Sequence, residues 1–399
     1  MQDLYMKYLS NQRGNRRSYF SQLMLLLTII FGLQGCIEPF DARVDEDVDL
    51  ISIEGSIIKG QPVQNIVVSR TTSLIYPQYR TIRQCNVVVV DDLDKQYRFN
   101  ENPDGTYSLE IPDEELVFNR EYQLQVTTPT GEYYESPFEA LNGGSEVDTV
   151  YYSVEDKVDK LTGDNLIGLQ FYVDLEAADS VSRYFRWNLI ETYEYISQRP
   201  ISYYFADESL VPMKYLVKDE YQYFRCWRTA RIPSLFLSST ENLTVNEKKK
   251  IPLNYVSNMS DRLAIKYSLF VEQYTLSESA YKYWQRNKIA TQESGGLYTQ
   301  QPGQPVTNIR NVNDPSEEIL GFFWVSHKTT QRIFVPRISS LPVITEPCEL
   351  VEFNAEDHGK GPFPVYIYVD VSGALMTGNP QCFVCTLKGG TTVKPEFWQ

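Results

Sequence analysis

The sequence contains very little histidine and only one long apolar run, which lies near the N-terminus. Histidine accounts for 2 of the 399 residues, which argues against metal sites or acid–base catalysis that depend on imidazole groups. The motifs G-x-S-x-G, G-x-G-x-x-G and H-E-x-x-H and the phosphate-binding loop are missing, and each marks a major enzyme class. We therefore predict a non-enzymatic protein with no catalytic residues, no metal and no cofactor.

Basic residues are also scarce. Lys and Arg number 37 against 52 Asp and Glu, a net charge of -15, whereas binding to nucleic acid requires clustered cations. We therefore expect no nucleic-acid partner. The single apolar run excludes several membrane-spanning helices. The composition, 42% hydrophobic and 22% charged, is ordinary for a globular chain of two or three domains.

Residues 1–35 have the order of a lipoprotein signal peptide. A basic segment precedes the apolar run 23–33, which is too short for a membrane span of roughly 20 residues. The run ends at Leu33-Gln34-Gly35-Cys36, which resembles a bacterial lipobox, so Cys36 is the predicted lipidation site. The alternative is a plain signal peptide with an incidental cysteine. Several acyl chains would hold the protein on a bilayer, since each buried methylene contributes about 0.8 kcal/mol.

Residues 36–48 are predicted to form an acidic tether. Carboxylates crowd this segment and the residue after it: Asp41, Asp45, Glu46, Asp47 and Asp49. A calcium loop that starts at Asp45 would need Gly at its sixth position, where this sequence has Leu50. The carboxylates therefore indicate a solvated, self-repelling tether.

Residues 49–140 are predicted to form a small immunoglobulin-like β-sandwich. Short alternating segments are separated by turn signals every 8–12 residues or so. The run Val87–Val90 is typical of a buried central strand. The turn Asn102-Pro103-Asp104-Gly105 predicts a hairpin, because Gly supplies the positive φ that such a turn needs.

Residues 145–399 are predicted to form a larger β-rich domain after a boundary at Asn142-Gly143-Gly144-Ser145. Apolar residues alternate with polar ones over 169–175, 185–189, 265–271 and 365–369. A helix is predicted to begin after Ser277, which can cap it, and to bury Ala280, Tyr281 and Trp284. The segment 296–316 is predicted to be a long surface loop.

Five cysteines remain after lipidation. Cys85 precedes the valine-rich strand and is interpreted as a small core residue. The other four, Cys226, Cys348, Cys382 and Cys385, are predicted to form two disulfides, because an exported protein meets an oxidising compartment. The sequence leaves three pairings open. A zinc site with four thiolates and a C-x-x-C redox site at Cys382 and Cys385 are the alternatives.

The 29 tyrosines are the most distinctive feature of the composition. Exposed tyrosine suits contact with sugars or partner proteins, although tyrosine is also common in strands for its packing alone. Two local clusters are the candidates for a binding surface: Tyr203, Tyr204 and Phe205, and Tyr221, Tyr223 and Phe224.

Several short motifs, taken in order, resemble a family of Bacteroidota lipoproteins that is a domain of unknown function. They are Leu33-Gln34-Gly35-Cys36, Ile53-Glu54-Gly55, Val67–Thr71, Cys226-Trp227, Ile319–Phe323, Arg332–Val335, the pair Cys382 and Cys385, Gly389-Gly390 and Pro395–Trp398. Members of this family are often encoded beside TonB-dependent outer-membrane receptors. The resemblance implies an outer-membrane location and a TonB-dependent receptor as partner, with no catalytic residues.

Two hypotheses from different classes follow. The first is an outer-membrane lipoprotein that helps a TonB-dependent receptor to bind or import a nutrient. The alternative is a structural or adhesion lipoprotein of the envelope. A glycosidase is a weaker third reading, since it needs two carboxylates about 5–10 Å apart in a cleft.

Overall fold

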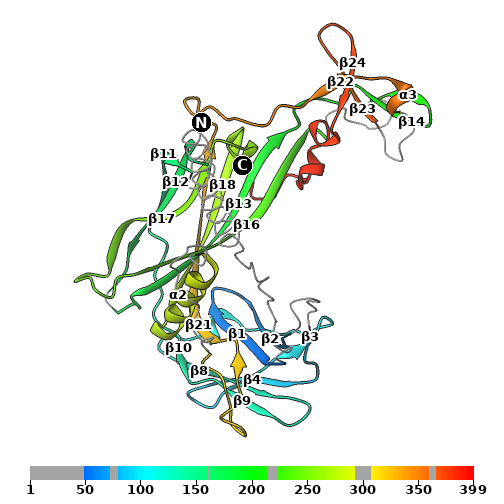
Figure 1. The fold of residues 1–399 in the computed structure, drawn as a ribbon. Coiled ribbons are helices and arrows are strands. Elements are labelled where there is room, and N and C mark those ends of the chain that lie inside the picture. The colour runs from blue at the N-terminus through cyan, green and yellow to red at the C-terminus, as the bar shows by residue number, and fades with distance from the viewer. Residues whose placement is uncertain are drawn as a thin grey trace, which may run out of the picture. The chain divides into compact units, whose positions relative to one another are not determined.

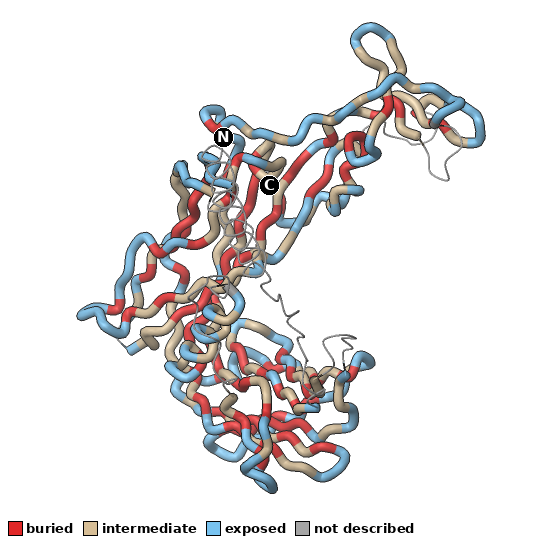
Figure 2. The backbone as a smooth tube through the Cα atoms, in the orientation of Figure 1, coloured by how far each residue is buried: buried red, intermediate tan, exposed pale blue. Residues whose placement is uncertain are grey.

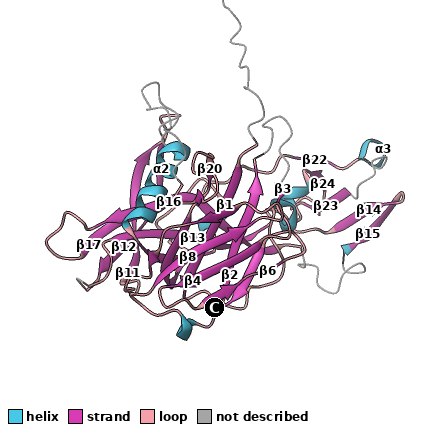
Figure 3. Cartoon of the chain, turned by 90° about the horizontal axis from the view of Figure 1, so that it is seen from below, coloured by secondary structure: helices cyan, strands magenta, loops and turns pink. Residues whose placement is uncertain are grey.

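The computed structural model describes residues 49–71, 80–159, 162–178, 180–213, 223–292, 307–358 and 365–399. The predicted signal peptide, the tether and Cys36 lie outside these ranges. Residues Asp49–Gln399 form one compact unit, and strands dominate it (Figure 3). The predicted mainly β class is confirmed. No helix among the described residues is long and apolar enough to cross a membrane.

One long sheet runs through most of this unit (Figure 1). Its strands lie in the order β16 (Arg225–Ser239), β13 (Tyr184–Ile196), β18 (Lys266–Leu276), β21 (Phe323–Pro336), β1 (Ile51–Lys59), β2 (Val63–Arg70), β7 (Tyr107–Glu110) and β6 (Asn100–Glu101), with β20 (Ile319–Leu320) paired to β1 and β3 (Arg80–Thr81) paired to β2. Strand β21 joins the two ends of this sheet. Residues 323–327 pair in parallel with β1, and residues 327–336 pair antiparallel with β18.

A second sheet packs on the β1–β2–β7 end. It contains β19 (Arg310–Asn311), β9 (Tyr133–Glu135), β8 (Glu121–Thr127), β4 (Asn86–Asp91) and β5 (Gln96–Arg98), and β10 (Glu139–Ala140) pairs with β8. Val87–Val90 are all buried in β4, between β8 and β5. The predicted hairpin is present as β6–β7, with Gly105 at a φ of +81°. These two sheets enclose the first hydrophobic core.

A third sheet packs on the other end of the long sheet. It contains β11 (Thr149–Val158), β12 (Asn165–Glu176) and β17 (Glu247–Ser257). The alternation read from the sequence is confirmed here, because Phe171, Val173, Trp187 and Leu269 are all fully buried in the second core. Figure 2 shows buried positions concentrated in the strands that meet in these cores.

Helix α2 (Glu278–Gln292) covers the opposite face of the long sheet. The predicted start is confirmed, because the Ala280 N–H donates to Ser277 Oγ at 3.2 Å. Ala280 is fully buried, and Tyr281 and Trp284 are half-buried beside it. Ser279 Oγ donates to the buried Glu139 carboxylate at 2.7 Å. This hydrogen bond links the first turn of α2 to strand β10.

The predicted domain boundary lies between the two cores, and the long sheet passes across it. The Ser145 carbonyl accepts hydrogen bonds from Gln273 Nε2 on β18 and Thr329 Oγ1 on β21. The predicted surface loop is wrong for residues 309–311, because Arg310 and Asn311 form β19 and Ile309 is only 4% exposed. Residues 312–316 are exposed and lie outside strands and helices, as predicted. Residues 296–306 of that loop lie outside the described ranges.

A small fourth sheet carries the C-terminal part of the chain. Its strands lie in the order β15 (Ser209–Pro212), β14 (Tyr203–Ala206), β23 (Val365–Val369), β24 (Leu375–Gly378) and β22 (Leu350–Glu352). The short helices are α3 (Ala355–His358) and the 3-10 turns η1 (Asp113–Glu115), η3 (Asp261–Leu263), η4 (Pro380–Cys382) and η5 (Cys385–Lys388).

Candidate functional site

Two disulfides fix the C-terminal segment, and all four predicted cysteines take part. Cys226 pairs with Cys385, and Cys348 pairs with Cys382. The sulfurs of the C-x-x-C segment are therefore bonded to distant partners rather than to each other, and none of the four remains a thiolate for zinc. Cys85 carries the remaining thiol in the described part of the chain. It packs against the first core, and burial raises the pKa of its thiol.

The Cys226–Cys385 bridge anchors η5 to the edge strand β16. Both cysteines are fully buried. The Tyr195 hydroxyl donates to the Cys385 carbonyl at 2.6 Å, and Trp227 and Thr391 exchange two backbone hydrogen bonds of 2.8 Å. The C-terminal segment thus adds hydrogen bonds to β16 beside the disulfide.

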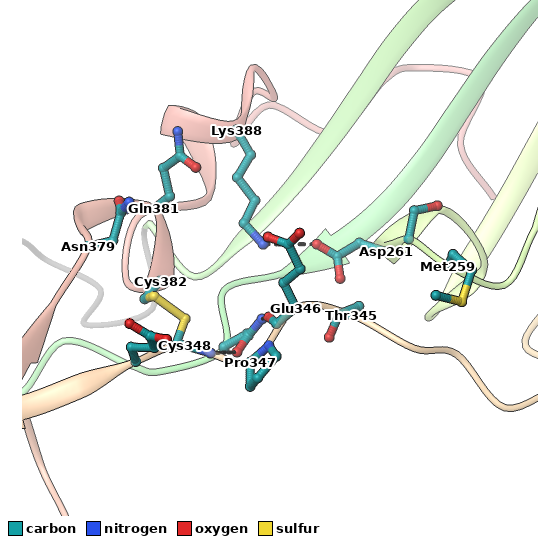
Figure 4. A pocket seen from close by; sticks show the side chains of 13 residues that line it. Met259, Asp261, Thr345, Glu346, Pro347, Cys348, Asn379, Gln381, Cys382 and Lys388 are labelled. Atoms are coloured by element: carbon teal, nitrogen blue, oxygen red, sulfur yellow. Dashed lines mark hydrogen bonds and ion pairs between the residues drawn. A yellow bond between two sulfur atoms is a disulfide. The ribbon is translucent and has the colours of Figure 1, made fainter. Parts of the chain in front are cut away.

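A cavity of about 500 Å³ opens beside the second disulfide (Figure 4). Distant parts of the chain line it: Gln198, residues 259–261, residues 345–349, Asn379, Gln381, Cys382 and Lys388. Lys388 Nζ pairs with Asp261 Oδ2 at 2.9 Å across the cavity wall, as the dashed line in Figure 4 marks. Gln198 holds the 345–349 segment, because its Oε1 accepts from the Cys348 N–H and its Nε2 donates to the Glu346 carbonyl.

Carboxylates dominate the charge of this cavity. Its charged side chains are the carboxylates of Asp261, Glu346 and Glu349 and one ammonium, that of Lys388. Its serine, Ser260, accepts a hydrogen bond from Arg262 and has no imidazole beside it in the lining. His327 lies elsewhere, edge-on to Phe118 at 5.2 Å, and burial lowers its pKa. The lining suits a polar ligand or a polar segment of a partner.

The predicted aromatic surface is only partly exposed. Tyr203 and Tyr204 are half-buried on β14, and the Tyr204 ring lies 5.9 Å from Tyr366. Phe205 is 7% exposed and packs against Phe353, so it belongs to the interior of the small sheet rather than to a binding surface. Replacing Phe205 with alanine should therefore lower the stability of the fold.

The second aromatic cluster also lies near the disulfides. Tyr223 packs half-buried against the Cys382–Val384 core, Phe224 is half-buried, and Tyr221 lies outside the described residues. Two of the predicted residues, Cys348 and Cys382, line this cavity. Tyr223 packs with them in one core, and its carbonyl accepts a hydrogen bond from the Cys385 N–H.

Sequence reasoning missed Gln198, Asp261 and Lys388. They are distant in sequence and belong to no local motif, so only the cysteines signalled that these segments meet.

Comparison with known families assigns most of this architecture to one group. Residues 37–332 match a family described as a domain of unknown function, DUF4249. The chain belongs to this family. The match ends within β21, so the small sheet's strands β22–β24 and three of the four bridged cysteines lie beyond the matched residues of this DUF4249 protein. No curated protein matches the chain.

Proposed function

We propose that this DUF4249 protein is a lipid-anchored, non-enzymatic protein of the bacterial outer membrane that assists a TonB-dependent receptor in nutrient binding or uptake. The observation that carries the proposal is the order of the basic segment, the apolar run and Leu33-Gln34-Gly35-Cys36. The family match begins at residue 37, directly after that cysteine. The proposed partner comes from the resemblance of the chain's motifs to Bacteroidota lipoproteins that are often encoded beside TonB-dependent receptors.

Two further features support an envelope protein. The described part of the chain carries two disulfides, which persist in exported proteins and are rare in reducing compartments. Its layered sheets offer rigid surfaces, and its cavity beside the Cys348–Cys382 bridge is lined mainly by polar and charged side chains. These features suit a protein that binds and presents a ligand or a partner.

The anchor is tested by replacing Cys36. The Cys36→Ala variant should stay uncleaved by the lipoprotein peptidase and should lose labelling by a palmitate analogue, because it lacks the sulfur that takes the lipid. Cys85→Ala is the matched control and should be labelled normally, since Cys85 packs against the first core. Normal labelling of Cys36→Ala would refute the anchor.

The partner is tested by purification from the native envelope. Tagged protein, extracted mildly from membranes, should enrich a TonB-dependent receptor, and the unanchored Cys36→Ala protein with the same tag should enrich it much less. Deleting the gene should reduce uptake through that receptor. If no receptor is enriched, or if uptake is unchanged, the alternative of a structural or adhesion lipoprotein takes its place.

A further inference from the structure

A second, smaller hollow lies between helix α2 and the long sheet, and no cysteine lines it. We call it the aromatic niche. Its volume is about 210 Å³. The floor is formed by side chains of β1 and β2, namely Glu54, Ser56, Asn65 and Val67. The wall is formed by aromatic side chains of α2 and the start of β21, namely Tyr283, Trp284, Phe322 and Trp324.

Strand alternation explains why this floor faces outward. Ile53, Ile57 and Ile66 are fully buried in the first core, so the intervening residues of β1 and β2 point to the opposite face of the sheet. Glu54 lies opposite Val67, and Ser56 lies opposite Trp324 on β21. The niche is therefore built on paired strands of the long sheet, which hold its groups in fixed positions.

The wall is rigid and its rings remain partly open. Tyr283 stacks on Phe322 with ring centroids 4.4 Å apart, and Trp284 meets Trp324 edge to face at 5.9 Å. Tyr283, Trp284 and Trp324 are half-buried, so each keeps ring surface that a ligand can cover. Such pre-organised rings give contact area at little cost in conformational entropy.

Charge selects the class of ligand. The Arg186 guanidinium already lies 3.5 Å from the Trp284 ring centroid and 5.7 Å from that of Trp324, so a second cation against these rings would be repelled. Glu54 is exposed, and within the described ranges no hydrogen bond or ion pair engages its carboxylate. That carboxylate repels anions. Glu54 attracts cations and Arg186 attracts anions, so a charged ligand of either sign meets one attractive and one repulsive group. A neutral ligand avoids both repulsions, and the niche therefore favours it.

The polar groups favour a ligand that carries hydroxyls. The Glu54 carboxylate and the Asn65 carbonyl accept hydrogen bonds, and the Ser56 hydroxyl both donates and accepts. Burial raises the pKa of Tyr283, a side-chain hydrogen bond with Asn287 lowers it in part, and the nearby Glu54 charge raises it. The Tyr283 hydroxyl therefore stays protonated and can donate. The volume is below the roughly 300–1,000 Å³ of pockets for drug-sized ligands, which suits one ring of a longer molecule.

A sugar ring meets all of these conditions, since its C–H faces stack on aromatic rings while its hydroxyls bond to carboxylate and amide groups. We propose that the aromatic niche is a carbohydrate-binding site that takes one neutral pyranose unit of a glycan against Trp324 and Tyr283, with Glu54 and Asn65 bonded to its hydroxyls. This goes beyond the proposed function, because it assigns a ligand class to another surface and requires no receptor.

The test is calorimetric titration of the whole mature protein, held in a detergent without a sugar headgroup. The probes are neutral oligosaccharides of glucose, mannose, galactose and xylose, with tetramethylammonium and a uronic-acid oligosaccharide as charged probes. At least one neutral oligosaccharide should bind saturably. Glu54→Ala and Trp324→Ala should each weaken that binding at least tenfold.

Glu110→Ala is the matched control, because Glu110 is another exposed carboxylate on the same sheet, on β7, and does not line the niche. It should leave the affinity unchanged. If Trp324→Ala fails to fold, Glu54→Ala and Asn65→Ala decide the question, since both side chains are exposed. The proposal is overturned if no neutral oligosaccharide binds, if only a charged probe binds, or if binding survives the Glu54 and Asn65 substitutions.

Discussion

Removing the Cys226–Cys385 disulfide should lower the free energy of unfolding by about 2–5 kcal/mol. This bridge joins residues 159 apart in sequence, so its loss restores much conformational freedom to the unfolded chain. In the folded protein it holds η5 against β16, together with the bond from Tyr195 to the Cys385 carbonyl. The double variant Cys226→Ala/Cys385→Ala avoids an odd thiol, and denaturant unfolding of oxidised protein measures the change.

Cys348→Ala/Cys382→Ala is the matched comparison. That bridge joins residues only 34 apart, and Cys382 is 6% exposed while Cys226 and Cys385 are fully buried. The loss of the shorter link should therefore cost less, because the entropy removed by a cross-link rises with the length of the loop that it closes. If both double variants retain the unfolding free energy of the unchanged protein, neither bridge contributes stability.

Local patterns of the sequence predicted the elements well because a strand or a helix exposes its own periodicity. The alternation through Phe171 and Val173 and the cap at Ser277 depend only on neighbours along the chain. The existence of two disulfides was predicted from the four cysteines other than Cys85 and from the expected export of the chain. Their pairing did not, since it depends on where β16, η4 and η5 come together.

Local patterns do not predict which strands pair when the strands are far apart in the sequence. Nothing near residue 323 indicates that β21 joins β1 in parallel, more than 260 residues earlier in the chain. That pairing extends the long sheet past the predicted boundary and places Trp324 beside Ser56. The aromatic niche and the cavity beside Cys348 are both products of such distant contacts. The sequence therefore pointed to single residues in them, such as Trp284, Cys348 and Cys382, but not to the sites that these residues form.

The second large effect on stability is expected from a substitution at Gly144, one of the two glycines at the predicted domain boundary. A Cβ added at Gly144 would lie 1.6 Å from His327 Nδ1 and 2.4 Å from the two adjacent ring carbons, far closer than non-bonded atoms can approach. His327 lies where β21 changes partner, since it pairs with Lys59 of β1 and with Thr275 of β18, and its ring contacts Phe118. The ring is thus confined on several sides. Gly144→Ala should lower the free energy of unfolding by about 1–3 kcal/mol, the usual cost of overpacking, as measured by denaturant titration.

Gly143→Ala is the control from the adjacent residue. Its added Cβ would meet its nearest neighbour, the Ser180 carbonyl oxygen, at 3.6 Å, an ordinary contact, and neither glycine has a positive φ. Gly143→Ala should therefore be nearly neutral. His327→Ala in the Gly144→Ala background should recover part of the loss, because it removes the ring that the new methyl group meets, and the double-mutant cycle then gives a clear coupling energy. Equal stability of the two alanine variants, or strictly additive effects in the cycle, would mean that residues 142–145 act as a free linker rather than as a segment clamped against the centre of the long sheet.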